Sequence, residues 1–98
     1  LISFKSKVFR YQGSSPWHFL PIPKSKSKSI YALPRWKKAS FGSIKVRAKI
    51  GNSRFETSIF PDTKTETYLL PLKKSVRDDE KIKSGDNIKA SIEIEYDP

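Results

Sequence analysis

The sequence contains an internal repeat, and a chain built twice from one unit can fold in few ways. Four apolar residues of the first half recur 51 positions later: Phe4, Val8, Phe9 and Trp17 match Phe55, Ile59, Phe60 and Tyr68. A second series recurs 44 positions later, in which Ile44, Val46, Ala48 and Ile50 match Ile88, Ala90, Ile92 and Ile94. We therefore predict a tandem duplication of a strand–strand–helix–strand unit, with pseudo-repeats at about residues 4–50 and 55–94.

Alternating apolar and polar residues indicate strands with one buried face, and residues 43–50 and 88–96 show this alternation most clearly. Further strands are expected at residues 3–11, 17–22 and 54–60, and another ends at Pro71. Short helices are expected after Pro23, beginning near Ser27, and after Pro71, beginning at Leu72. The fold class predicted is a mainly β single domain spanning residues 1–98, with about six strands and two short helices. The expected core comprises Phe4, Val8, Phe19, Ile44, Val46, Ala48, Ile50, Phe55, Ile59, Leu70, Val76, Ile88, Ala90, Ile92 and Ile94.

Charge is distributed very unequally between the two repeats. Residues 1–50 contain 12 Lys or Arg and no Asp or Glu, whereas residues 51–98 contain 8 basic and 10 acidic side chains. In the repeat alignment, Lys49 takes the position that Glu93 has in the second copy. We expect one side of the molecule to be strongly positive.

The residue types needed for catalysis are scarce. The chain has one histidine and no cysteine. His18 is interpreted as a structural or surface residue, because a lone histidine in a chain without cysteine is a poor case for a nucleophile–base pair or a metal centre. Asp78, Asp79 and Glu80 are adjacent on a short helix and predict a solvated acidic patch, and Asp86 is interpreted as a turn residue after Gly85. The prediction is therefore no enzyme, no cofactor, no metal and no catalytic residue.

A basic insert at about residues 24–40 favours binding instead. It combines cations with aromatic rings and contains no acid, and this mixture suits nucleic acid, since cations neutralise phosphates and rings stack on unpaired bases. Trp36 fits either a stacking role or a place in the core. The candidate nucleic-acid-binding residues are Lys5, Lys7, Arg10, Lys24, Lys26, Lys28, Arg35, Trp36, Lys37, Lys38, Lys45, Arg47 and Lys49.

The chain also resembles a small bacterial family of uncharacterised domains, found alone or joined to a YdeI/OmpD-associated domain. The most specific matching segments are SIFPD, YLLPLKKSVR and IKSGD, and the resemblance covers nearly the whole chain. It implies a double-split β-barrel related to the AbrB and MazE proteins, with two subunit-like halves fused into one chain. It implies no catalytic residues, because the family has no established activity.

Together these observations predict a non-enzymatic RNA-binding protein. A surface that is positive in one half only suits a structured RNA better than the symmetric half-sites of a DNA regulator. We expect an accessory ribosomal protein, most consistent with the large subunit, contacting rRNA and neighbouring ribosomal proteins as a monomer. No apolar run is long enough for a membrane span, so a cytoplasmic location is expected. An AbrB-like DNA-binding regulator and a small-ligand or protein-interaction module stay as alternatives.

Overall fold

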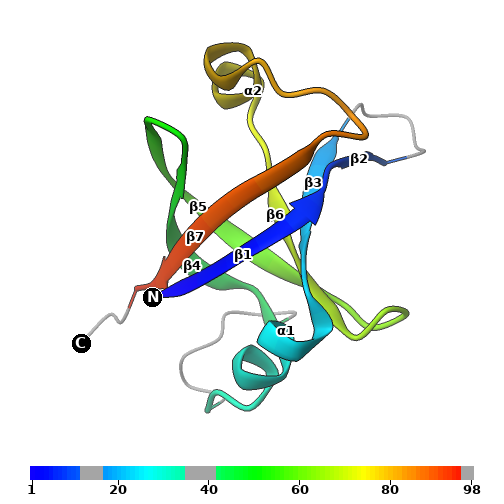
Figure 1. Ribbon diagram of the computed structural model, residues 1–98. Helices are drawn as coiled ribbons and strands as arrows, with labels where there is room; N and C mark the ends of the chain where they lie inside the picture. Colours follow the sequence, from blue (N-terminus) through cyan, green and yellow to red (C-terminus); the bar gives the residue numbers. More distant parts are fainter. Residues whose placement is uncertain (12–16, 35–41, 96–98) are drawn as a thin grey trace.

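The computed structural model describes residues 1–11, 17–34 and 42–95. Within these residues, seven strands form one sheet in the order β1-β7-β4-β5-β6-β3-β2, which curls into a nearly closed barrel (Figure 1). The strands are β1 (Ile2–Lys7), β2 (Phe9–Arg10), β3 (His18–Ile22), β4 (Ile44–Ile50), β5 (Ser53–Asp62), β6 (Thr67–Pro71) and β7 (Asn87–Ile94). The helices are α1 (Lys24–Tyr31) and α2 (Lys74–Glu80), which lie near opposite ends of the barrel in Figure 1. The prediction of a mainly β fold with two short helices is confirmed.

The barrel closes at Val8. β1 and β2 lie at the two ends of the strand order, yet only this residue separates them along the chain. The Val8 amide donates to the Asp86 carbonyl at 2.9 Å, and its carbonyl accepts from the Gly85 amide at 2.8 Å. Gly85 has φ of 96°, a conformation that costs glycine little. The first strand predicted from the sequence is therefore divided in two, which makes seven strands where six were expected.

The strand pairings have the symmetry expected of two equivalent halves, which we define as residues 2–50 and 53–94. Phe4 of β1 pairs with Ala90 of β7, as Phe55 of β5 pairs with Ala48 of β4. The β2–β3 pairing has its counterpart in β5–β6, and the β3–β6 and β4–β7 pairings each join one half to the other. In this register, residues of β4 correspond to residues 42 positions later in β7, as Ala48 does to Ala90. The alignment of the sequence repeats had placed the counterpart 44 positions later. Duplication as the origin of the halves stays a prediction.

The core lies inside the barrel, and most predicted core residues are buried there. Phe19 is an error of the prediction, because it points outward while Leu20 is fully buried. Both alternating sets of residues 17–22 are apolar, so the alternation could not decide which set faces inward. Phe55, Ile88 and Ile94 are half-buried and pack against the core. The core also includes residues that the prediction omitted: Leu20, Ile22, Ile30, Tyr68, Leu72 and Ile82.

Several element boundaries also differ from the sequence prediction. α1 begins at Lys24, directly after Pro23, because Ser27 and Ile30 are buried against the barrel and hold the helix in place despite its serines. α2 begins at Lys74, two residues later than expected. β5 continues through Pro61 to Asp62, two residues beyond the predicted end of that strand at residue 60. A tight turn at Gly51 and Asn52 joins β4 to β5.

Candidate nucleic-acid interface

Three of the predicted cations lie on α1. Lys24, Lys26 and Lys28 are all exposed, and the helix has no acidic residue in its first turn. Lys24 forms a long ion pair with Glu66 across 3.7 Å, and both side chains are mostly exposed. Cations near a helix N-terminus oppose the helix dipole, and like charges four residues apart repel. Lys24 in the first turn therefore opposes the helix dipole, whereas Lys28 lies in the last turn, where the dipole favours a cation.

The cations of β4 lie in a different environment. Lys45, Arg47 and Lys49 face outward, but β4 lies between β5 and β7, which belong to the second half and both carry acidic residues. The Arg47 Nε lies 3.0 Å from Glu95 Oε1 and 3.9 Å from Glu56 Oε1. Lys49 pairs with Ser91, which is also its counterpart in the register of the two halves. The pairing of the two halves thus partly neutralises β4, and Glu93 is not the counterpart of Lys49.

The cations of β1 and β2 make a third group. Lys5 and Lys7 are exposed, and Lys5 lies directly opposite Lys89 of β7. Arg10 is exposed and lies opposite His18. The other candidates, Arg35, Trp36, Lys37 and Lys38, lie outside the described residues. The predicted cations that the structure describes therefore lie on α1, on β4, and on β1 and β2, and both β1 and β4 pair with β7. One strongly positive side stays a prediction.

An aromatic cluster on the outer surface of β2 and β3 was not predicted as a site. The Phe19 ring lies 5.8 Å from the Phe9 ring and 6.5 Å from the Tyr11 ring, measured between centroids. Trp17 stacks on Phe19, with centroids 6.1 Å apart and ring planes 8° from parallel. Trp17 nevertheless keeps 53% of its surface exposed, and the nearby Phe60 keeps 42%. Large exposed aromatic side chains gathered in one place mark interaction surfaces.

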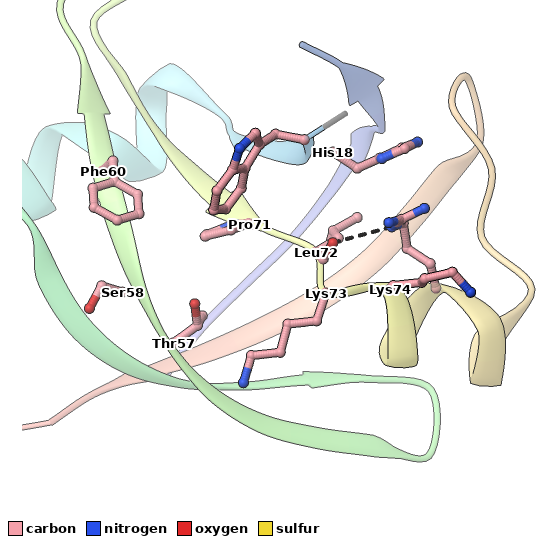
Figure 2. A pocket seen from close by; sticks show the side chains of 10 residues that line it. His18, Thr57, Ser58, Phe60, Pro71, Leu72, Lys73 and Lys74 are labelled. Carbon is pink, nitrogen blue, oxygen red and sulfur yellow. Dashed lines mark hydrogen bonds between the residues drawn. The ribbon is translucent and has the colours of Figure 1, made fainter. Parts of the chain in front are cut away.

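A hollow of about 560 Å³ lies between this cluster and α2 (Figure 2). We call it the Trp17 hollow. Its walls are largely apolar and include Trp17, Phe60 and Pro71. Lys73, Lys74 and Arg77 line it from the side of α2, together with His18 from β3. A smaller hollow of about 220 Å³, lined by Tyr11, Trp17, Phe19 and Phe60, adjoins it through the two shared rings.

The basic side chains of the Trp17 hollow differ in how they are held. The Arg77 Nε donates to the Leu72 carbonyl at 3.2 Å, which fixes the base of that side chain. The Lys74 Nζ contacts Asp78 Oδ2 at 2.9 Å, so its charge is partly balanced. None of the residues lining the hollow is Asp or Glu. The hollow therefore combines an apolar floor with positive groups along one side.

The sequence did contain a signal for this site. Trp17 and Phe19 alternate with Leu20 and Ile22, and two opposite apolar faces on one strand indicate that one of them is exposed or covered by a partner. The prediction placed Phe19 in the core and so missed the aromatic face. Finding it required the pairing of Phe9 with Phe19, which brings rings from two strands together.

The acidic residues make contacts of different kinds. Asp78 pairs with Lys74, and Glu80 Oε2 accepts a hydrogen bond from Ser53 Oγ at 2.7 Å. Asp86 Oδ2 accepts from the Lys83 amide at 2.9 Å, which confirms its role in the turn. Within the described parts of the chain, no group of three or more His, Asp or Glu is arranged to hold a metal ion. Among those same residues, no helix is long and apolar enough to cross a membrane.

Comparison with known families identifies the chain. The model of the family described as "Domain of unknown function (DUF1905)" matches residues 4–92. The protein therefore belongs to this family, in agreement with the resemblance noted in the sequence. A search of curated proteins gave no match.

Proposed function

We propose that this protein binds structured RNA without catalysing a reaction, and that it is an accessory component of the ribosome. The observation that carries the proposal is α1, an eight-residue helix with three exposed lysines and no acid. α1 itself supplies no acidic partner for these lysines, and the ion pair of Lys24 with Glu66 is long and exposed, so the charge of the helix is available to an anionic partner. Phosphates of RNA are such a partner, since each neutralised phosphate releases condensed counterions.

The second half argues against a symmetric DNA-binding surface. α2 is the counterpart of α1, and the positions of Lys24, Lys26 and Lys28 correspond there to Lys74, Val76 and Asp78. Of these three positions in α2, only the first carries a cation, Lys74, and Lys74 forms an ion pair with Asp78 at the third. A regulator that reads two half-sites would use matching contacts from both halves. One basic helix instead suits an RNA recognised by its shape and its phosphates.

The test compares the parent protein with a variant in which Lys24, Lys26 and Lys28 are changed to Ala. Binding to a structured RNA is measured at several salt concentrations. Each lost phosphate contact should reduce the slope of log affinity against log salt by roughly 0.7 to 0.9, so the variant should lose about 2 to 3 units of slope. A control variant with Lys64, Lys83 and Lys89 changed to Ala removes the same charge from the second half and should retain most of the slope.

The ribosomal part of the proposal needs its own experiment. Crosslinking in native cells, followed by sequencing of the attached nucleic acid, should recover rRNA, and the protein should sediment with the large ribosomal subunit. Recovery of promoter DNA would replace the proposal with DNA regulation. Recovery of no nucleic acid above background would leave the small-ligand or protein-interaction alternative.

A further inference from the structure

The Trp17 hollow, which lies beside α2, has a counterpart beside α1 that is covered. Trp17 and His18 correspond there to Thr67 and Tyr68 in the register of the two halves. Tyr31 lies over this counterpart: its hydroxyl donates to the Thr67 carbonyl at 3.1 Å, and its ring lies 4.8 Å from the ring of Tyr68. The residue that corresponds to Tyr31 in the second half is Lys81, which directly follows α2 and is exposed. One half therefore covers this surface with its own aromatic side chain, and the other leaves it open.

The open side is already arranged to receive a flat ring. Trp17 is held parallel to Phe19, so little side-chain freedom is lost when a ligand ring stacks on it. Trp17 and Phe60 both line the two adjoining hollows, and both are exposed. The volume of about 560 Å³ lies within the range of small-molecule and nucleotide sites, which is roughly 300 to 1,000 Å³.

The charges around the hollow indicate what kind of ligand it can bind. Its polar side is formed by Lys73, Lys74 and Arg77, with no lining carboxylate. An apolar floor beside cations fits a ligand that carries a flat ring next to a negative group, and an unpaired nucleotide has this composition. A purely apolar protein segment would leave the cations unused.

Resting on the proposed function, we propose that the Trp17 hollow binds an unpaired nucleotide of the RNA partner, with the base stacked on Trp17 and the adjoining phosphate beside Lys73. Base pairing hides both faces of a nucleobase inside a duplex, whereas a loop or bulge exposes them. The protein thus holds RNA at two places, through phosphates at α1 and through an exposed base at the hollow. This arrangement selects RNAs in which a helix adjoins unpaired nucleotides.

The experiment uses a short mixed-sequence oligoribonucleotide, either single-stranded or annealed to its complement. The parent protein carries Trp36→Phe, so that Trp17 is the sole fluorescent tryptophan. The single strand should quench Trp17 fluorescence and bind more tightly than the duplex. Trp17→Ala should weaken single-strand binding roughly 5- to 140-fold with little change in salt slope, because stacking involves no counterion release. Trp17→Phe should restore most of the affinity, since it restores a stacking ring.

Charge variants test the phosphate contact. Lys73→Ala should lower the salt slope for the single strand by roughly 0.7. Lys83→Ala removes the same charge from an exposed residue that does not line the hollow and should leave the slope unchanged. Thermal melting of each variant shows that it remains folded.

The outcomes separate this inference from the proposed function. If Trp17→Ala binds the single strand as well as its parent while the α1 lysine variant loses affinity for structured RNA, the hollow is not a base site and the protein still binds RNA. If neither RNA binds, both proposals fail. If an acidic, aromatic peptide quenches Trp17 and the single strand does not, the occupant is a protein segment and the inference is overturned.

Discussion

The two halves of the barrel share one backbone plan and differ in how each attaches its helix. Both helices follow a residue in extended conformation, Pro23 before α1 and Lys73 before α2. Ser27, the fourth residue of α1, is fully buried; its hydroxyl donates to the Ile22 carbonyl at 2.9 Å and accepts from the Tyr68 amide at 3.0 Å. Arg77, the fourth residue of α2, is half-buried and donates to the corresponding carbonyl of Leu72.

The C-terminal ends of the two helices also differ, because that of α1 is buried against the barrel and that of α2 is held by polar contacts. Near the end of α1, Ile30 is fully buried and Tyr31 packs on Tyr68. The corresponding Glu80 of α2 instead accepts a hydrogen bond from Ser53, and Lys81 takes the left-handed conformation with φ of 54° and ends the helix. The comparison shows that small and apolar side chains dock one helix on the barrel. At α2 the corresponding positions carry longer polar side chains, of which Arg77 lines the Trp17 hollow and Glu80 contacts Ser53.

The largest expected effects test whether the halves are equivalent at the centre of the barrel. Leu20 and Leu70 pair with each other across β3 and β6, and both are 0% exposed. Changing either to Ala should lower the free energy of unfolding by about 2–5 kcal/mol, through lost apolar burial and the cavity left behind. Denaturant unfolding of the parent protein and of both variants measures this change in the free energy of unfolding. A cost near zero for one leucine beside a full cost for the other would show that the halves differ at their core.

The next effect separates the two helix attachments. Ser27→Ala should cost about 1–3 kcal/mol, because the Tyr68 amide and the Ile22 carbonyl are buried and lose a hydrogen-bond partner. Arg77→Ala should cost less than about 1 kcal/mol, since water reaches that half-buried site. Ser25→Ala, an exposed position on α1, is the control for helix propensity. Equal losses for Ser27→Ala and Arg77→Ala in urea unfolding would contradict the distinction.

Tyr31 and Tyr68, whose rings lie 4.8 Å apart beside α1, should give the protein a dependence on alkaline pH. Burial, followed by the Asp62 and Glu66 carboxylates, raises the pKa of Tyr31 above its ordinary value of 10.0, and burial likewise raises the pKa of Tyr68. A raised folded-state pKa means that the unfolded chain loses its proton first. The stability from these tyrosines is therefore present below about pH 10 and falls as the pH rises toward the folded-state pKa values.

The measurement for Tyr31 compares parent and Tyr31→Phe unfolding at pH 8 and above pH 10. At pH 8 the variant should lose about 0.5–1.5 kcal/mol with the hydrogen bond to Thr67. Above pH 10 the difference should shrink, because Phe does not titrate and lysine deprotonation is common to both proteins. A difference that grows with pH would show that the sign is wrong.

The smallest effect concerns the end of α2. The Ile82 amide donates to the Arg77 carbonyl at 2.8 Å and the Lys81 amide to the Asp78 carbonyl at 3.4 Å, a pattern that favours glycine at the left-handed residue. Lys81→Gly should raise stability by roughly 0.5–1 kcal/mol, and Lys81→Ala, which removes the same charge, should not. Tyr31→Gly at the matching position of α1 should instead destabilise, because that residue is helical. Thermal melting of the three variants checks the contrast.

The β-rich class, the strand alternation and most of the core could be predicted from the amino-acid sequence alone. These depend on side-chain period within single segments, and residues 44–50 show it without ambiguity. The turns at Gly51 and Gly85 could also be predicted from the sequence, because a backbone with positive φ favours glycine.

Tertiary structure decided everything that depends on which segments become neighbours. Leu20 and not Phe19 faces inward because β3 pairs with β2 and β6, a choice that two apolar alternating sets left open. The basic strand β4 is partly neutralised because β5 and β7 of the second half flank it and Glu95 pairs with Arg47, which the net charge of the first half did not predict. The Trp17 hollow exists because β3, β5 and α2, distant in sequence, converge there. The alternation of apolar and polar residues indicates which side of one strand is buried, whereas a binding surface is formed by residues from several strands and helices.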